Sequence, residues 1–378
     1  MDKTKNPRAG SDAERVSAIF KPPAKPLARG AWLWWFWLFF IHDENTKKSG
    51  KCRQIMILWS VKNDADIVCN GMRIKSSKIT PAGKNYALDG AAAAWYYDGK
   101  RMREGAQFVL EKSKMILRPE AMELEAPGGT PSSFSLVNGD YVTKIRADDI
   151  EFELRAKKTD PHPAVGPTYG HTPLMGSMEI EGTRLEILEL SGWEKKTNGN
   201  RTRIQGTAYF QKILLAAPPP QWYWGLYHFD DGSFATYMLA YAGRAALAHN
   251  LLGAPELRSP TLSIKQDILV YHAPSGQVYE GSRLALKPSR SAVKECWKHV
   301  FAGGGKDFEV KGEAEGYAHA CWTFSKNIGN LPLRSTFKYN EYPAVMKRLE
   351  IVPLGKGRKT IVLQNGVGNM ENSWGFLI

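Results

Sequence analysis

The sequence lacks an apolar run long enough to form a membrane-spanning helix. The longest run, Ala31–Ile41, is about half of the roughly 20 residues that a spanning helix needs. The residues before it include acids, and no small-x-small cleavage site follows, which argues against a signal peptide. A long β-strand explains the run best, and an interfacial anchor or a membrane segment is the alternative.

Cysteine is scarce, and most catalytic and binding motifs are missing. The 4 cysteines are far apart and form no CxxC, which predicts free thiols in a reducing, cytoplasmic compartment. No Walker loop, dinucleotide fingerprint, HExxH, GxSxG or EF-hand loop occurs. His162 and His171 share a loop but have no carboxylate cluster around them. The sequence therefore predicts neither a metal site nor a cofactor.

The chain is basic without a nucleic-acid motif. Its 51 Lys and Arg outnumber 38 Asp and Glu, giving a net charge of +13. The basic residues are scattered and match no RNA-binding, zinc-finger or helix-turn-helix pattern, so no nucleic-acid partner is predicted. A solvated basic surface is the simplest interpretation. Peripheral association with an acidic membrane surface is the alternative that this charge allows.

Aromatic residues and turn formers are abundant. The chain has 12 Trp, 15 Tyr, 15 Phe, 35 Gly and 22 Pro, a composition typical of many short strands joined by turns. Helical periodicity is scarce: Ala245–Leu252 and Arg290–Val300 are the best short candidates, and a short helix near Ala13–Phe20 is an alternative to full disorder within the N-terminal tail. Three consecutive prolines in Ala216–Trp222 mark a boundary, because proline cannot donate to a strand ladder. We therefore expect an all-β fold: a disordered basic tail (residues 1–28) and two β domains (29–217 and 218–378), each an antiparallel barrel or sandwich.

The most aromatic segment opens the first domain. Four tryptophans and three phenylalanines lie within Trp32–Phe40, and a polar stretch with Gly50 separates them from a second apolar segment, Gln54–Val61. This pattern predicts a β-hairpin. Both faces of its first strand are apolar, as expected for a strand covered on both sides or lining an apolar cavity. We expect one face to pack the core and the other to meet a lipid-like ligand, with Trp35 and Trp37 as the candidates.

Two stretches together resemble the hydroxyneurosporene synthase, or carotenoid hydratase, family of lipocalin-like proteins. The first is the opening hairpin, in which Gly30 and Trp32 form the Gly-x-Trp start of a lipocalin-like barrel. The second is Ile204–Gly243, in which a Gly-x-aromatic strand precedes the sequence Trp-Tyr-Trp-Gly at Trp222. The resemblance implies two tandem lipocalin-like domains. It also implies cofactor-free hydration of a terminal C=C bond in an isoprenoid or carotenoid-like polyene.

The same resemblance indicates where catalytic groups would lie. The carotenoid hydratases carry an aromatic-x-Asp pair on the strand before Trp-x-Trp-Gly. Here Tyr209 keeps the aromatic residue, but Gln211 replaces the acid, and an amide cannot deliver a proton at neutral pH. His228 and Asp230, with Asp231, are the substitutes within reach in the sequence. The Asp231-Gly232 pair is also a turn signal, which would place these acids in an exposed hairpin loop.

Further aromatic residues are candidates for binding an apolar ligand. Trp222 and Trp224 are two residues apart on one strand, so both rings point the same way, and Tyr227 points the opposite way. They flank a cavity at the domain junction or fill the core between sheets. Tyr317 and His319 share a strand face in the same manner and would line a second pocket or lie half-buried. Tyr237 completes the set of ligand-binding candidates.

Three functions follow from this sequence. The first is a hydratase or cyclase acting on an apolar polyene, with an acid beside Tyr209 and Gln211. The second is a non-catalytic carrier of such a ligand, which the missing aspartate favours. The third is an interaction protein whose barrels are filled and hold no ligand. An acid within an aromatic cavity would distinguish the first from the others.

Overall fold

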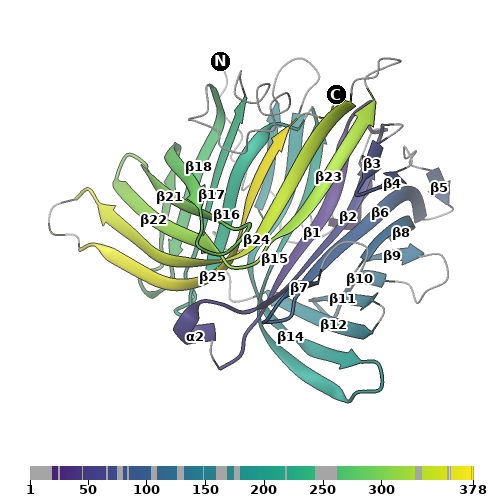
Figure 1. Ribbon diagram of the computed structural model, residues 1–378, viewed down its shortest axis with the longest axis horizontal. Helices are drawn as coiled ribbons and strands as arrows, with labels where there is room; N and C mark the ends of the chain where they lie inside the picture. Colours follow the sequence, from purple (N-terminus) through teal and green to yellow (C-terminus); the bar gives the residue numbers. More distant parts are fainter. Residues whose placement is uncertain are drawn as a thin grey trace.

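In the computed structural model the chain is almost entirely antiparallel β-structure, arranged as a barrel and a second sheet that lie side by side (Figure 1). The all-β, lipocalin-like fold expected from the sequence is confirmed. The structure describes residues 19–23, 26–44, 46–64, 67–74, 80–82, 85–103, 109–125, 132–147, 149–158, 168–173, 179–217, 219–242, 262–327, 334–355, 357, 359–375 and 377. No helix in these ranges is long and apolar enough to cross a membrane.

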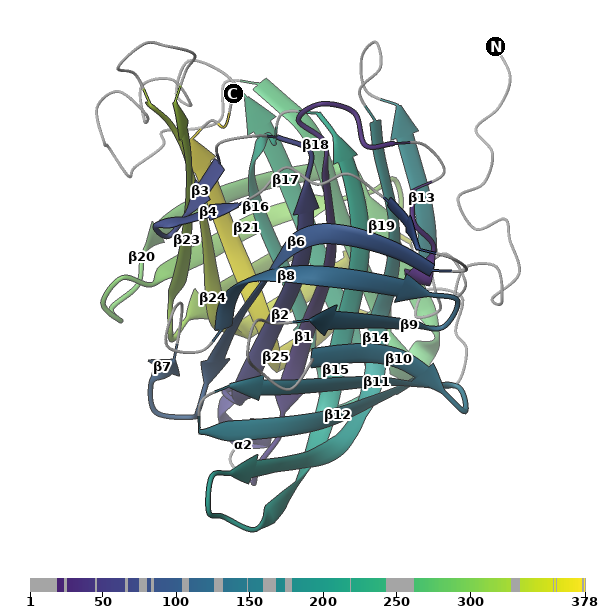
Figure 2. The ribbon, with the colours of Figure 1, turned by 90° about the vertical axis from the view of Figure 1, so that its right-hand side faces the viewer.

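The first sheet closes on itself. Ten of its strands form a ring in the order β12-β11-β10-β9-β8-β6-β2-β1-β15-β14, and β14 pairs with β12 to complete it (Figure 2). Three short strands, β5, β7 and β13, lie off the ring. The bounds are β1 Trp32–Ile41, β2 Arg53–Lys62, β5 Thr80–Ala82, β6 Asn85–Tyr97, β7 Met102–Arg103, β8 Val109–Arg118, β9 Ala121–Glu125, β10 Ser132–Val137, β11 Asp140–Ala147, β12 Ile150–Lys158, β13 Thr168–Pro173, β14 Glu179–Lys196 and β15 Arg201–Ala216.

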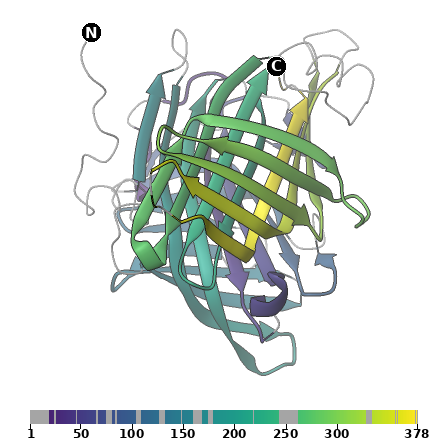
Figure 3. The same ribbon diagram turned by 90° about the vertical axis from the view of Figure 1, so that its left-hand side faces the viewer.

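The second sheet has the order β19-β18-β17-β16-β25-β24-β22-β21-β20 and is seen face-on in Figure 3. Strand β23 pairs with one end of the long strand β24, and the β3–β4 hairpin extends this edge. The bounds are β3 Ile67–Cys69, β4 Met72–Ile74, β16 Gln221–His228, β17 Phe234–Ala242, β18 Leu262–His272, β19 Gln277–Gly281, β20 Arg283–Arg290, β21 Trp297–Gly304, β22 Phe308–Gly316, β23 Ala320–Asn327, β24 Arg334–Pro353 and β25 Ile361–Gly375.

The two predicted β domains interlock. β15 ends the barrel at Ala216 and β16 opens the second sheet at Gln221, on either side of the proline run. However, β3 lies in the chain between β2 and β6 of the barrel, yet it pairs with β23 of the second sheet. A cut at residue 217 would therefore separate β3 and β4 from their partner strand.

The sequence also predicted a disordered tail and two helices, and the structure corrects some of these expectations and does not describe the others. The predicted tail is described only in part: Ile19, Phe20 and Leu27 are buried in the barrel core, so this portion packs rather than remaining disordered. The helix expected at Arg290–Val300 is wrong, because β20 ends at Arg290 and β21 begins at Trp297. Residues 1–18 of the tail and the helix expected at residues 245–252 lie outside the described residues. The short helices that are described include α2 Thr46–Ser49 and the 3-10 turn η2 Ala273–Ser275.

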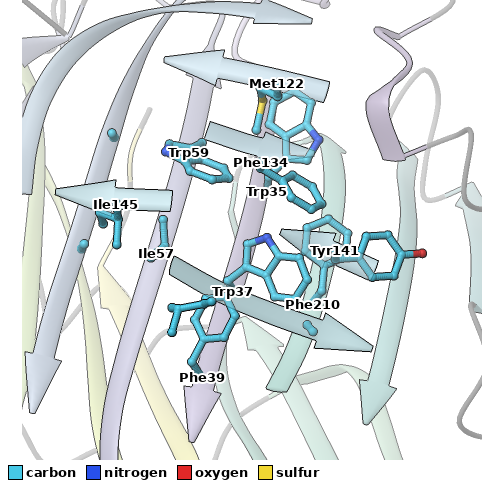
Figure 4. Packing of buried hydrophobic residues seen from close by; sticks show 14 of the residues in the cluster. Trp35, Trp37, Phe39, Ile57, Trp59, Met122, Phe134, Tyr141, Ile145 and Phe210 are labelled. Carbon is cyan, nitrogen blue, oxygen red and sulfur yellow. The ribbon is translucent and has the colours of Figure 1, made fainter. Parts of the chain in front are cut away.

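The predicted aromatic hairpin is confirmed, and it lies at the centre of the molecule. β1 pairs with β2 on one side and β15 on the other. Its odd-numbered residues point into the barrel, where Trp37 lies 4.7 Å from Phe210 and 5.1 Å from Phe39 between ring centroids (Figure 4). Its even-numbered residues, including Trp32 and Phe36, join a second cluster against the other sheet. Burial of both faces explains the uninterrupted apolar run.

Candidate active site between the barrel and the second sheet

A cavity of about 140 Å³ lies between the outer wall of the barrel and the second sheet. Its walls are mainly aromatic and aliphatic, with a few polar groups, as is usual for a small-molecule site. The lining residues are Trp32, Trp34, Phe36, Leu58, Ile180, Arg184, Gln211, Ile213, Leu215, Pro219, Pro220, Trp222, Trp224, Met238, Lys265, Phe337, Tyr339 and Glu371.

Strand register orders these residues by depth. On the barrel wall, Arg184, Gln211, Phe36 and Leu58 are successive Cα partners across four strands and so lie at one level. Trp224, Glu371 and Met238 form the matching level of the second sheet, since both neighbours pair with Trp224. The Trp224 and Phe36 rings meet edge-on, with centroids 6.5 Å apart. The two levels therefore face each other.

The floor and the mouth of the cavity follow from burial. Leu38 and Leu226, which lie beyond the level of Phe36, are fully buried and close the inner end of the cavity. Two residues in the other direction, Trp34 and Trp222 are only half-buried. The polar groups Arg184, Gln211 and Glu371 thus lie at the inner end of the cavity, and the mouth is lined mainly by apolar side chains, together with Lys265.

Glu371 is the carboxylic acid of this cavity. Strand β25 places it between two aromatic donors: Trp222 Nε1 donates to Oε2 at 2.8 Å, and the Tyr339 hydroxyl donates to Oε1 at 2.7 Å. The residue is only 4% exposed. Burial raises the pKa of Glu371 from 4.5 to about 7, although both hydrogen bonds oppose the shift. This carboxyl group can hold a proton at neutral pH and release it to a partner.

A second glutamate, Glu341, stands beside it. Glu341 on β24 is the direct cross-strand partner of Glu371 and is fully buried. Its Oε2 accepts a hydrogen bond from Trp95 Nε1 at 2.8 Å, and it does not line the cavity. Burial, followed by the charge of Glu371, raises the pKa of Glu341 well above its ordinary value. The pair therefore keeps a proton on Glu341 and leaves Glu371 as the group that titrates near neutrality.

This pair makes stability depend on pH. Folded Glu371 keeps its proton between pH 4.5 and about 7, where the unfolded chain loses it. The folded state binds more protons in this window, so the free energy of unfolding falls as pH rises through it, by about 3 kcal/mol for this one residue. We expect Glu371→Gln to remove that part of the pH dependence in urea unfolding at pH 5 and pH 8. A variant whose stability relative to wild type is the same at both pH values would contradict this assignment.

The sequence-predicted catalytic residues separate into two groups. The Tyr209 hydroxyl donates to Gln211 Oε1 at 3.0 Å, and Gln211 lines the cavity. His228 and Asp230 do not line it. His228 is held by Thr207 Oγ1 at 2.8 Å and the carbonyl of Glu186 at 2.9 Å, and burial lowers its pKa to about 3, so it is neutral. Asp230 is exposed in the β16–β17 turn. Neither substitute acid reaches the cavity, as the turn signal at Asp231 indicated.

The ligand-binding candidates also divide. Trp222 and Trp224 line the cavity together, with Tyr227 on the opposite face of β16 in the second core. Trp35 and Trp37 do not, because they have odd numbers on β1 and fill the barrel. The assignment to these two residues is corrected: Trp32, Trp34 and Phe36, on the other face of the same strand, line the cavity.

Tyr237, Tyr317 and His319 have structural partners instead of facing the cavity. The Tyr237 hydroxyl lies 2.7 Å from His299 Nδ1 inside the second core. The Tyr317 hydroxyl donates to the carbonyl of Cys52 at 3.0 Å and accepts from Gln54 Nε2 at 2.9 Å. The His319 ring stacks on Tyr342 with centroids 4.9 Å apart. The contacts of these three residues therefore hold neighbouring strands together, and none of the three lines the cavity.

Sequence reasoning missed Glu371, Glu341 and Arg184. One signal for Glu341 was present: it directly follows the predicted strand that ends at Asn340 and precedes Tyr342, in a segment where an acid is costly to bury. Glu371 lies outside the strands predicted from the sequence. The pairing of the two glutamates could not be read, because it depends on the register of β24 with β25. Among the described residues, no group of three or more His, Cys, Asp or Glu side chains could hold a metal ion.

Comparisons with known proteins support the fold. No protein-family model matches the sequence, and neither does any curated protein. A candidate AttH protein of Nitrosomonas europaea is similar in structure, with a TM-score of 0.50 and 12% identity over 94% of this chain and 99% of that one. CghA with Sch210972 (TM-score 0.47, 9% identity, 92% and 88% covered) and kievitone hydratase from Nectria haematococca (0.45, 9%, 92% and 89%) are more distant. At these identities the likeness concerns architecture, so the chain shares the two-part lipocalin-like fold of the Nitrosomonas protein along nearly its whole length.

Proposed function

We propose that this protein is a cofactor-free hydratase that adds water to a C=C bond of an apolar, isoprenoid-like substrate. One observation carries the proposal: Glu371, a buried carboxyl group with a pKa of about 7, lies in the wall of an aromatic cavity. General acids are most effective when their pKa is near the working pH. The resemblance to carotenoid hydratases implies the same reaction class, and Glu371 takes the place of the acid that Gln211 replaces.

The reaction needs one proton, which Glu371 lends and recovers. The Glu371 carboxyl protonates the less substituted alkene carbon, and the π electrons form the new C–H bond. The other carbon becomes a tertiary carbocation. A water oxygen then bonds to that carbon, and the proton that the water loses returns to Glu371. The sum is alkene plus water giving a tertiary alcohol, with the acid regenerated.

The surrounding side chains fit the charges of these steps. The carboxylate left after protonation accepts hydrogen bonds from Trp222 and Tyr339, which stabilise its negative charge. The ring faces of Trp222, Trp224 and Phe36 would stabilise the carbocation. Gln211 uses its Oε1 to accept from Tyr209, which leaves its amide N–H groups to hold the attacking water.

The cavity volume limits how much of a substrate enters. A volume of about 140 Å³ is close to that of an engineered apolar cavity that binds benzene. A short isoprenoid, or the end of a longer chain projecting through the mouth, matches this size better than a whole carotenoid.

The dependence of turnover on pH tests the proposal. We expect hydration of a trisubstituted terminal alkene, followed by mass spectrometry of the alcohol, to fall tenfold per pH unit above about pH 7, because the active form of Glu371 is protonated. A panel of unsaturated C10 to C20 isoprenoids is a suitable first set. Tight binding without any alcohol at pH 5 to 8 would favour the non-catalytic carrier, the second function that the sequence suggested.

A further inference from the structure

Arg184 is a cation in the wall of a mainly apolar cavity. Strand β14 directs its side chain into the cavity at the level of Gln211 and Phe36. Within the part of the chain that the structure describes, Arg184 forms no hydrogen bond and no ion pair. A guanidinium that leaves water without a partner is costly, so such a group is usually paired when its site is occupied.

The acidic groups nearest to Arg184 act on it through space without forming an ion pair. Although burial opposes the shift, the charges of Glu186 and Asp267 raise the pKa of Arg184. Glu186 is buried, and burial raises its pKa although the charge of Arg184 opposes this shift. Asp267 already pairs with Lys265, whose Nζ lies 2.8 Å from its carboxylate. Lys265 also lines the cavity. It pairs across strands with Ala240, which in turn pairs with Trp222, so Lys265 lies at the level of Trp222, nearer the mouth than Glu371. Among the described residues on this side of the cavity, Lys265 therefore has a carboxylate partner within ion-pair distance, whereas the Arg184 guanidinium has none.

The acid and the arginine lie on opposite sides of the cavity. Arg184 is on β14, which is two strands from β1 in the barrel wall. On the other sheet, Trp224 packs against Phe36 of β1, and Glu371 is the next residue across from Trp224, farther from β14. The two strand spacings from β14 to β1 and the further one from β16 to β25 add to about 14 Å between backbones. Because both side chains line the cavity, a single extended ligand of about ten carbons can reach both groups.

We propose that the substrate carries an anionic group, a carboxylate or a phosphate, which Arg184 binds while the alkene lies against Glu371. The inference rests on the proposed function for the position of the alkene, and on Arg184 for the charge. A guanidinium fork matches carboxylate and phosphate oxygens bidentately, which would fix the orientation of the substrate. Arg184 is thus a specificity-determining residue, and an uncharged polyene would be a poor ligand.

Calorimetric binding of three C10 probes tests this assignment. The probes are geranic acid, geranyl monophosphate and the uncharged alcohol geraniol, which share one isoprenoid chain. We expect both anions to bind wild type more tightly than geraniol, and Arg184→Gln to weaken the better anion about 10- to 100-fold while affecting geraniol far less. Arg184→Lys should restore part of the affinity. Comparison of the two anions identifies whether carboxylate or phosphate is preferred.

The control is Arg203→Gln, which removes the same charge from an exposed position on β15. Thermal unfolding of each variant checks that the fold is retained, and the lysine variant serves if the glutamine variant unfolds. Equal affinity of wild type for geraniol and both anions, or unchanged anion affinity in folded Arg184→Gln, would overturn the inference.

Binding to Glu371→Gln separates this inference from the proposed function. If this variant and wild type bind the anion through Arg184 and neither forms an alcohol, the anion site stands and the hydratase function fails. If wild type hydrates geraniol as readily as the anions, the function stands and the anion site is rejected.

Discussion

Replacement of Glu371 by glutamine should reduce hydration by about 10²- to 10⁴-fold, the range that a general acid contributes. The amide keeps nearly the same shape, and its oxygen can accept a hydrogen bond from Trp222 or Tyr339. It cannot donate a proton to carbon. The loss should therefore appear in kcat, measured by alcohol formation at pH 6, with little change in substrate affinity.

Glu341→Gln is the matched control for this experiment. Glu341 is the cross-strand partner of Glu371 and is equally buried, but it does not line the cavity. Its amide can still accept the hydrogen bond from Trp95. Because Glu341 is already protonated at neutral pH, we expect turnover within about tenfold of wild type. Wild-type turnover by Glu371→Gln, or equal losses in both variants, would exclude Glu371 as the acid.

Trp37→Ala should lower the free energy of unfolding by about 3 to 5 kcal/mol, the cost of removing a large side chain from a packed core. Trp37 is fully buried and lies within 4.7 to 6.1 Å, between ring centroids, of Phe39, Phe134, Tyr141 and Phe210. The residues around it come from several strands of the closed barrel, so its loss cannot be repaired by a local shift. Urea unfolding at pH 5 measures the change.

Trp34→Ala on the same strand provides the comparison. Trp34 points out of the barrel, lines the cavity and is only half-buried, with its ring 5.8 Å from Trp32. We expect a loss of about 1 kcal/mol in stability, since most of its lost contacts face an open cavity. Binding of an apolar ligand should weaken instead. If Trp34→Ala were the more destabilising variant, the assignment of the two faces of β1 would be inverted.

The hairpin and the paired tryptophans show how far sequence reasoning reached. Period-two alternation placed Trp222 and Trp224 on one face and Tyr227 on the other, and the structure has them so. For β1, alternation assigned the residues to two faces. It could not show which face meets the cavity, because both faces are apolar. Trp35 and Trp37 fill the barrel core, and the even-numbered residues Trp32, Trp34 and Phe36 line the cavity.

The sequence by itself determined the all-β class, the aromatic hairpin and the passage from the first sheet to the second at the proline run. It also determined that the Gln211 amide cannot serve as the proton donor. These depend on local periodicity, turn chemistry and the properties of single side chains. Only the tertiary structure decided that the cavity lies between the barrel and the second sheet, and that Glu371, Arg184 and Gln211 meet there. Arg184 and Gln211 lie on the consecutive strands β14 and β15, but Glu371 lies on β25, far away in the chain. Sheet register and the packing of the two sheets bring them together, which no local pattern encodes. The proton affinity of Glu371 has the same origin, since burial against another sheet raises its pKa.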